Sequence, residues 1–476
     1  MKLTIVGLGP GHEDDITRRA WRILHEAKHL YLRTARHPAV AAIQRDYESF
    51  DGLYETANNF ESLYETIAGH VLQMVQEHEE VAYAVPGHPL VGEQTVTLLL
   101  QKAGEIPVEI VDGMSFIEPS LKLLSIDAMA GLQIHDAAEI AQMHHPPLNP
   151  DQPALIGQVY SKAVASDVKL TLMNQYPDEH PVVLLHRAGL PDGIRESLAL
   201  YEIDRSPHIA HLTTLYLPPL HRASSFEYFQ DIIAHLRAPD GCPWDKEQTH
   251  LSLRPYLMEE TYEVLDALDK EDMTALCEEL GDLLLQVVLH SQVAIEEGHF
   301  TMADILAGIS DKIVRRHPHV WGDVEVKTVS DLNRVWETQK QAEKTNNGDQ
   351  PKSLLEGLPA ALPALIQAYK YQKKAAKVGF DWGDIAPVYE KVLEEIEEIR
   401  HADNPDERTN EIGDLLFAVV NLARWLEVEP EIALRAANQR FRRRFEYIEQ
   451  YAGRNLKDMT LAEMDLLWNE AKSKGF

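Results

Sequence analysis

Apolar residues in the first 220 positions fall into short runs that glycine or proline closes. LTIVGLG, VAYAVPG, VEIVDG and PVVLLHRAG are examples, and such runs predict β-strands. Helical stretches lie between them, which is the alternation of an α/β fold. TTLYLPPL, from residue 213, predicts a last strand that Pro218 and Pro219 end. We therefore expect an α/β domain over residues 1–220.

Beyond residue 224 the apolar positions take helical spacing, as in the stretches that start at Leu253, Leu276 and Leu415. One unit of this all-α half occurs twice, over residues 225–335 and 360–472. The polar, glycine-containing segment 336–359 predicts a linker between the copies. The chain is thus expected to be multidomain, with a duplicated helical bundle as its second half.

Each copy carries the pattern EExxE on one predicted helix and ExxD on the next. Residues three and four apart share a helix face. The residues are Glu259, Glu260, Glu263, Glu279 and Asp282 in the first copy, and Glu394, Glu395, Glu398, Glu411 and Asp414 in the second. Both aspartates lead into apolar runs, LLLQVVLH and LLFAVVNLA, which we expect to be buried nearly all round. Anions clustered there are unfavourable unless a cation compensates them.

A set of ligands made of carboxylate oxygens, with no cysteine sulfur or histidine nitrogen, suits Mg²⁺, or Mn²⁺ as an alternative, rather than zinc. Inward carboxylates from two helices are a known way to build a metal site in a bundle. A di-iron site would need Glu-x-x-His, and here the residue three positions on is Asp282 or Asp414. For any single glutamate, a solvated surface position is the alternative interpretation.

Several further segments occur in a fixed order around these acids. They are GCPWDKEQTHLSLRPYLMEETYEVLDAL, EELGDLLLQVVLHSQVA and DKIVRRHPHVWGDV in the first copy, and KKAAKVGFDW, EEIEEI and EIGDLLFAVVNLARWL in the second. The helical half resembles the MazG family of nucleoside triphosphate pyrophosphohydrolases, in tandem. The resemblance implies Mg²⁺-dependent hydrolysis of NTPs and dNTPs to NMP and pyrophosphate.

The resemblance also implies roles for the acids. The metal ligands are Glu260, Glu263, Glu279 and Asp282, with Glu395, Glu398, Glu411 and Asp414 in the second copy. Glu259 and Glu394 remain to orient or deprotonate water. The sequence does not distinguish the active copy or the preferred base and sugar.

Basic and aromatic residues are candidates for binding the substrate. Arginine suits phosphate oxygens, and a tryptophan can stack on a base. The candidates are Trp244, Lys246, Lys312, Arg315 and Arg316 in the first copy, and Lys374, Trp382, Asn438, Arg440, Arg443 and Arg444 in the second. The alternatives are a surface helix with salt bridges and tryptophans that belong to the core.

The first half carries GLGPG after its first strand, which fits close approach of the backbone to a ligand. Gly11 falls one position short of the dinucleotide-binding pattern. With VPGHPLVGE, VDGMSFIEPS and LIGQVYS, this half resembles the tetrapyrrole methylases, which bind S-adenosylmethionine between two α/β lobes. The implied site residues are Gly7, Gly9, Gly11, Gly87, His88, Ser115, Phe116 and Tyr160.

His88 departs from the methylase pattern, because the family usually has Asp before this proline. The sequence thus leaves open a working S-adenosylmethionine site or a methylase fold kept as a scaffold. Two other functions remain as well. One is a methyltransferase acting on a tetrapyrrole-like substrate with the helical half accessory, and the other is a helical half that serves as a metal-stabilised interaction module.

The net charge and the cysteine content argue against some classes of partner and of fold. The chain has 76 acidic and 45 basic side chains, a net charge of −31, so its overall field repels nucleic acid. Only Cys242 and Cys277 occur, which argues against a disulfide framework. The N-terminus lacks a signal-peptide pattern, and no apolar run is long enough to span a membrane. We expect a cytoplasmic protein that acts on nucleoside triphosphates as a homodimer, without nucleic-acid or membrane partners.

Overall fold

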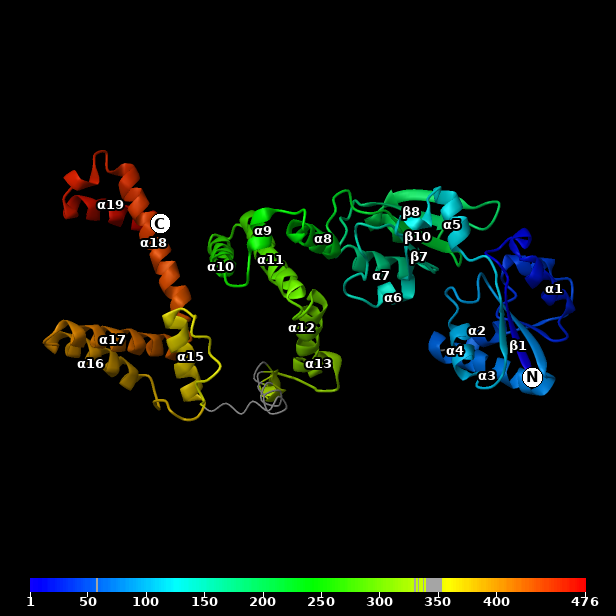
Figure 1. Ribbon diagram of the computed structural model, residues 1–476, viewed down its shortest axis with the longest axis horizontal. Helices are drawn as coiled ribbons and strands as arrows, with labels where there is room; N and C mark the ends of the chain where they lie inside the picture. The colour runs from blue at the N-terminus through cyan, green and yellow to red at the C-terminus, as the bar shows by residue number, and fades with distance from the viewer. Residues whose placement is uncertain (57–58, 329–330, 333, 337, 340–352) are drawn as a thin grey trace. The chain divides into compact units, whose positions relative to one another are not determined.

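The computed structural model describes residues 1–476 except 57–58, 329–330, 333, 337 and 340–352. It forms two compact units, Met1–Cys242 and Pro243–Phe476. Figure 1 shows strands and helices in the first unit and helices in the second. The α/β and all-α halves predicted from the hydrophobic pattern are therefore confirmed.

The first lobe of the first unit is a parallel five-stranded sheet in the order β3-β2-β4-β1-β5. Its central strands β1 and β4 pair in register from Lys2 with Glu80 to Gly7 with Val85. Leu3, Ile5 and Tyr83 are fully buried, so these strands are apolar over most of their length. The strands are β1 (Lys2–Gly7), β2 (Leu30–Leu32), β3 (Glu48–Ser49), β4 (Glu80–Val85) and β5 (Val108–Val111), and the helices are α1 (Arg18–Glu26), α2 (Asp51–Thr56), α3 (Phe60–His78) and α4 (Gln94–Lys102). Helix α5 (Ile117–Leu124) follows β5 and packs against the second sheet, where Leu124 shares a core cluster with Leu155 and Val183.

The second lobe is a mixed five-stranded sheet in the order β6-β7-β10-β8-β9. Strand β10 runs antiparallel to both β7 and β8, and its start at Thr213 agrees with the expected last strand. The elements are β6 (Gln133–Asp136), α6 (Ala137–Ala141), β7 (Ala154–Gly157), α7 (Lys162–Leu172), β8 (Pro181–His186), β9 (Ile194–Ala199) and β10 (Thr213–Leu217).

Helix α8 (Phe226–Arg237) follows the second lobe and belongs to the first compact unit. The backbone amides of Ser224 and Ser225 donate to the carboxylate of Asp151, and Ser225 caps the helix. The division of the chain by contacts therefore falls after Cys242, later than the expected start of the first helical copy at residue 225. Most of the expected linker, 336–359, lies outside the described residues.

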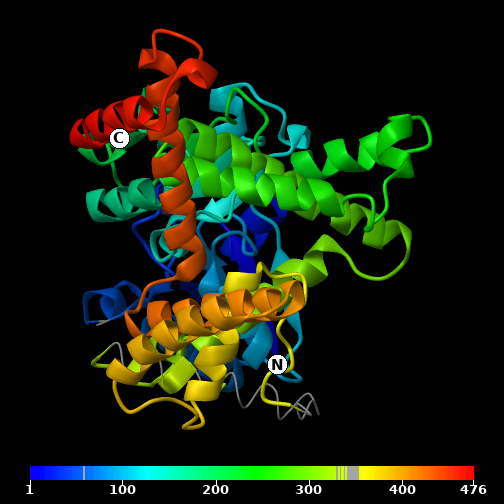
Figure 2. The same ribbon diagram turned by 90° about the vertical axis from the view of Figure 1, so that its left-hand side faces the viewer.

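The helical unit contains two similar hairpins, α10 with α11 and α16 with α17. Both views show α16 and α17 side by side (Figures 1 and 2). The helices are α9 (Pro243–Glu247), α10 (Arg254–Asp269), α11 (Met273–Glu296), α12 (Met302–Arg316), α13 (Pro318–Trp321), α15 (Ala364–Ala376), α16 (Ala386–His401), α17 (Pro405–Trp425), α18 (Pro430–Tyr451) and α19 (Leu461–Ser473).

Local signals explain the helix ends. Asp272 accepts hydrogen bonds from the amides of Thr274 and Ala275 and so begins α11. The helical pattern that starts at Leu415 is divided in the structure, because Glu427 adopts φ 57° and Pro430 lacks an amide proton. None of the described helices combines the length and the apolar character needed to cross a bilayer.

The two apolar runs after Asp282 and Asp414 are buried on one side only. Val288 is 2% exposed, but Leu284 is 41% exposed, and in the second run Leu416 is 53% exposed. The expectation of runs buried nearly all round is therefore wrong for the single chain. Each hairpin has too few neighbouring helices to cover both faces.

Candidate active site

The first carboxylate cluster lies between α10 and α11. The tight turn after Asp269 makes the helices antiparallel and places Glu279 beside Glu260 and Glu263. One carboxylate oxygen from each of these three residues lies within 4.8 Å of the others. Partial burial, a hydrogen bond with Glu263 and the charge of Asp282 raise the pKa of Glu260. The cluster is thus a site where negative charge is concentrated.

The second cluster lies between α16 and α17 and has the same construction. Oxygens of Glu395, Glu411 and Asp414 lie within 4.8 Å of one another. Glu395 is 3% exposed, and its Oε2 atom has no hydrogen-bond partner among the described residues. Partial burial and the charges of Glu395 and Glu411 raise the pKa of Glu398.

A lysine distinguishes the second cluster from the first. Lys391 Nζ lies 2.8 Å from Glu395 Oε1 and 3.0 Å from Glu394 Oε1. The hydrogen bonds that Lys391 donates to these two glutamates raise the pKa of Lys391. The residue four positions before Glu260 in the first copy is Tyr256. The second cluster is therefore partly neutralised by a side chain of its own helix.

The residues present fit a hard divalent cation. Both clusters offer only oxygen atoms, close together on two helices, and a buried carboxylate oxygen of the second has no partner in the described part of the chain. Each cluster brings together three of the four expected ligands. The fourth lies nearby in both copies. The charge of Asp282 raises the pKa of Glu260, and the charges of Glu395 and Glu411 raise the pKa of Glu398. The roles of Glu259 and Glu394 stay predictions.

The basic and aromatic candidates lie on other elements. Lys312, Arg315 and Arg316 are in the last two turns of α12, and Asn438, Arg440 and Arg443 are exposed on α18. Trp244 is 51% exposed and contacts Tyr256 edge to face, and Trp382 is 43% exposed. Lys246 lies in α9. All of these stay predictions as substrate-binding residues.

Two of the basic candidates contact the protein itself. Lys374 donates to the carbonyl oxygens of Leu354 and Glu356 at 3.1 and 2.8 Å. Arg444 donates to the carbonyl of Phe476 at 2.8 Å and stacks over Trp468. These bonds give both side chains a role in holding the chain segments beside α15 and α18.

A polar group near Trp382 was not predicted. Asp381 accepts hydrogen bonds from Arg424 at 2.6 Å and from the indole of Trp425 at 3.1 Å. Arg424 also donates to Asn421. Asn421 and Arg424 lie two to three turns beyond Asp414 on α17. The signal was present in the segments GFDW and NLARW, whose polar residues interrupt otherwise apolar runs.

In the first unit, the glycines of the loops after β1, β4 and β5 are in backbone contact with one another. Gly9 and Gly87 form a backbone bridge, with amide-to-carbonyl distances of 3.2 and 2.8 Å. A Cβ atom on Gly7 would lie 2.6 Å from the Gly87 carbonyl, and one on Gly113 would lie 2.3 Å from it. The loops after β1, β4 and β5 thus interlock at the carboxyl edge of the sheet, where α/β folds bind ligands.

The loop of the second lobe after β8 covers part of this edge. A Cβ atom on Gly189 would lie 2.8 Å from the Pro10 side chain, and one on Gly11 would lie 3.0 Å from Leu190. Gln158 bonds the Gly92 carbonyl at 3.3 Å. The two lobes therefore approach each other at the predicted S-adenosylmethionine site.

The remaining predicted cofactor residues are held by neighbours. His88 Nε2 lies 3.6 Å from Asp112, and Ser115 donates to Glu118 at 2.7 Å. The ring of Phe116 packs against Gly157. Tyr160 lies in the loop before α7. Seven of the eight predicted residues lie at or after the ends of β1, β4 and β5, and Tyr160 lies after β7 of the second lobe. Their binding of a cofactor stays a prediction.

His37 is a buried residue of this edge that sequence reasoning missed. Its side chain is 7% exposed, and its ring bonds to the backbone of Gly9. Burial lowers the pKa of His37 to about 4. The ring is thus neutral at physiological pH and supports the glycine loop. A lone histidine after the second strand has no pattern that would have revealed this.

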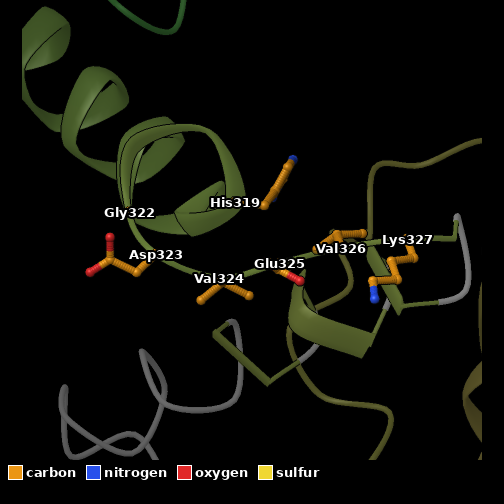
Figure 3. A pocket seen from close by; sticks show the side chains of 7 residues that line it. All are labelled: His319, Gly322, Asp323, Val324, Glu325, Val326 and Lys327. Carbon is orange, nitrogen blue, oxygen red and sulfur yellow. The ribbon is translucent and has the colours of Figure 1, made fainter.

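A hollow beside α13 is separate from all these groups. Figure 3 shows it lined by His319, Asp323, Glu325 and Lys327 together with Gly322, Val324 and Val326. It contains none of the predicted catalytic or metal-binding residues.

Both halves match known families. Residues 2–204 match the tetrapyrrole (corrin/porphyrin) methylases, and residues 248–321 match the MazG nucleotide pyrophosphohydrolase domain. The chain is 46% identical over 250 residues to the nucleoside triphosphate pyrophosphohydrolase of Escherichia coli K12, covering 51% of this chain and 94% of that protein. The Thermotoga maritima MazG pyrophosphohydrolase is 43% identical over 250 residues, with coverages of 52% and 95%.

One solved structure similar to the first half is uroporphyrin-III-C-methyltransferase of Thermus thermophilus. It covers 46% of this chain and 94% of its own, at 20% identity and a TM-score of 0.37. Protein YabN of Bacillus subtilis strain 168 is similar over the whole length, at 44% identity over 492 residues, which is 99% of this chain and 98% of that protein. The chain therefore belongs to the YabN family, with a tetrapyrrole methylase domain followed by a MazG nucleotide pyrophosphohydrolase domain.

Proposed function

We propose that the helical unit hydrolyses nucleoside triphosphates to NMP and pyrophosphate with Mg²⁺. The observation that carries this proposal is the pair of carboxylate clusters at equivalent places in two hairpins. Membership of the MazG family supports the reaction, since the related proteins of E. coli and T. maritima are named nucleoside triphosphate pyrophosphohydrolases.

The chain's own carboxylates divide into two roles. Glu260, Glu263, Glu279 and Asp282 hold the ion in the first copy, as Glu395, Glu398, Glu411 and Asp414 do in the second. A bound divalent ion offsets the negative charge of the triphosphate and of the entering and leaving oxygens. Glu259 and Glu394 accept a proton from the attacking water, whose oxygen bonds to the α-phosphorus as pyrophosphate leaves.

Further aromatic and basic groups of the helical unit bind the nucleotide. Trp382 and Trp244 are exposed aromatic surfaces next to the carboxylate hairpins, and stacking on them tolerates any base. Arg424 is held by Asp381 and Asn421 in a fixed orientation. Arg440 and Arg443 are exposed cations on α18. This arrangement favours recognition of the triphosphate and the ring face over recognition of a particular base.

A second copy of the chain completes the helical unit as a homodimer. The carboxylate hairpins expose apolar side chains, among them Leu284 and Val287 on α11 and Leu416, Phe417 and Val419 on α17. Such faces mark association surfaces rather than solvent-facing ones. A hairpin of another copy has the matching apolar character, so an isologous interface covers both.

The methylase domain is a second candidate activity. Its interlocked glycine loops and the close approach of the two lobes favour binding of S-adenosylmethionine at the carboxyl edge of the first sheet. The replacement of the family's Asp by His88 argues for altered use of the cofactor. Calorimetric titration with S-adenosylmethionine and S-adenosylhomocysteine tests this activity, and absence of binding favours a scaffold.

The position of bond cleavage tests the hydrolase proposal. Phosphorus-31 spectra of ATP incubated with the protein and Mg²⁺ should show AMP and pyrophosphate in equal amounts. Formation of ADP and phosphate would contradict the proposed cleavage between the α and β phosphates.

A further inference from the structure

Two exposed aromatic rings contact each other near the start of the α10–α11 hairpin. Tyr256 is 38% exposed in the first turn of α10, and Trp244 is 51% exposed in α9. Their ring centroids lie 5.8 Å apart with the ring planes at 77°, which is an edge-to-face contact. Rings that only filled the core would be covered by their neighbours. These two rings instead form an open aromatic corner.

The spacing along α10 places Tyr256 on the helix face that carries the first carboxylate cluster. Tyr256, Glu260 and Glu263 are separated by four and three residues, and side chains at these intervals are neighbours on a helix. The second copy shows that this position reaches the carboxylates. Lys391 stands there in the place of the tyrosine, and its Nζ atom lies 2.8 Å from Glu395 Oε1. The aromatic corner is therefore next to the proposed ion.

Hydrogen bonds of Gln248 fix the segment that joins the two rings. Its side-chain amide donates to the carbonyl of Trp244 at 3.0 Å, and its side-chain oxygen accepts from the hydroxyl of Ser252 at 2.7 Å. The backbone amides of Thr249 and Ser252 each donate to the hydroxyl oxygen of the other residue, at 2.9 and 3.2 Å. Leu253, directly before α10, is 1% exposed. The corner is thus formed before a ligand binds, which lowers the entropy lost on binding.

The second copy is built differently at this place. Lys391, at the position of Tyr256, is paired with Glu395. The residue directly before its tryptophan is Asp381, which accepts a hydrogen bond from Arg424, whereas the first copy has a proline there. An aromatic ring stacks on any nucleobase, and an ammonium group that is paired with a carboxylate offers no such surface. The aromatic corner is therefore a feature of the first copy.

We propose that Trp244 and Tyr256 bind the base of a nucleoside triphosphate whose phosphates lie at the first carboxylate cluster. The base stacks on one ring and meets the edge of the other. Along α10, Tyr256 lies about 6 Å from Glu260 and about 10 Å from Glu263, the rise of four and of seven residues. A nucleotide bridges such a span because its sugar separates the base from the phosphates. This assignment rests on the hydrolysis proposed above and gives the first copy a subsite for the base.

The test compares a nucleotide with a probe that has no base. The nucleotide is α,β-methylene-ATP, which cannot be hydrolysed between its α and β phosphates, and the second probe is tripolyphosphate. Both are titrated by calorimetry with Mg²⁺ into the full chain carrying Glu398→Gln, so that binding is measured at the first cluster. We expect Tyr256→Ala to weaken binding of the nucleotide at least about fivefold and to leave the affinity for tripolyphosphate unchanged.

Three further variants separate stacking on the base from effects on folding and on the ion. Tyr256→Phe keeps the ring and should restore the nucleotide affinity that Tyr256→Ala loses. Glu263→Gln, which removes a proposed ligand of the ion, should weaken the binding of both probes. Tyr47→Ala, at an exposed tyrosine of the first unit, is the matched control and should change neither affinity.

The possible outcomes distinguish the two proposals. An equal loss for both probes in Tyr256→Ala would show that the ring supports the cluster rather than the base, and it would overturn the subsite. Undiminished nucleotide binding in Tyr256→Ala would overturn the subsite as well and leave the hydrolysis standing. Wild-type protein that binds neither probe would contradict the proposed hydrolysis and the subsite together.

Discussion

Lys391 and Glu395 form an ion pair inside the second carboxylate cluster, with Nζ 2.8 Å from Oε1. The same ammonium group contacts Glu394, the expected base, at 3.0 Å. The first copy has Tyr256 at the corresponding position. A divalent ion entering the second cluster must therefore compete with a cation that the chain supplies, and the two copies are expected to bind metal with different affinity.

Removing this lysine tests that competition. Lys391→Met leaves two carboxylates without their internal cation, so the second cluster should bind Mn²⁺ about fivefold or more tighter, a change of about 1 kcal/mol. The measurement is a Mn²⁺ titration followed by electron paramagnetic resonance in a Glu263→Gln background. Lys370→Met, at an exposed lysine on α15, is the matched control. Weaker Mn²⁺ binding in Lys391→Met would show that the lysine supports the ion rather than competes with it.

The raised pKa of Glu260 predicts how metal affinity depends on pH. Burial and the neighbouring acids Glu263 and Asp282 disfavour its charged form. Protonation therefore begins above the ordinary glutamate range, and Mn²⁺ affinity of the first cluster should fall as pH falls into that window. The stability of the metal-free chain should change in the opposite direction and rise as pH falls through this window. The metal-free chain carries this repulsion at neutral pH and loses it as Glu260 protonates.

Two titrations check this prediction. Mn²⁺ affinity is measured between neutral pH and the ordinary glutamate range, in wild type and in Glu260→Gln. Thermal unfolding is measured in chelator over the same range. An affinity that is constant down to the ordinary glutamate value would contradict the proposed crowding of charge.

The glycine contacts of the first lobe predict a large difference between two Gly→Ala changes. Gly113→Ala places a Cβ atom 2.3 Å from the Gly87 carbonyl, so the loops must move apart. We expect a loss of about 1–3 kcal/mol in the free energy of unfolding. Gly69→Ala, inside α3 with no atom within 4 Å of the new Cβ, should add about 0.5–1 kcal/mol. Urea unfolding measures both, and equal effects would refute the interlocked loops.

The exposed apolar face of α17 predicts the assembly. Leu416→Asp introduces a charge into the proposed interface and should convert the dimer to monomer in sedimentation velocity runs. Leu170→Asp, at a leucine that is 58% exposed in the first unit, should leave the assembly unchanged. Wild-type protein that sediments as a monomer at micromolar concentration would contradict the proposed homodimer.

Much of the architecture could be predicted because the hydrophobic pattern is local. Strands such as β1 and β4 are recognisable as short apolar runs that glycine or proline ends. The carboxylates on α10, and those on α11, share a helix face because their spacing matches the helical period. The acids of the two copies were recognisable because the repeat presents them twice. These features depend only on neighbours within one or two turns.

The rest depends on contacts between distant segments, which spacing does not show. Lys391 lies in the same helix as Glu395, yet its ion pair depends on rotamers. Arg424 meets Asp381 across 43 positions. The apolar run after Asp414 was expected to be buried nearly all round, but its composition does not show how many neighbouring helices cover it, and Leu416 is 53% exposed. GLGPG was expected to approach a ligand, and the structure adds that its glycines approach Gly87 and Gly113.

The central claim is that the carboxylate hairpins hydrolyse nucleoside triphosphates. Its most direct test is pyrophosphate release from a panel of NTPs and dNTPs with Mg²⁺ or with chelator, for wild type, Glu263→Gln, Glu398→Gln and the double variant. We predict Mg²⁺-dependent release that falls at least about 100-fold in the double variant and in one of the single variants, which identifies the active copy. Wild-type protein that releases no pyrophosphate from any nucleotide, or a double variant with undiminished release, would contradict the account.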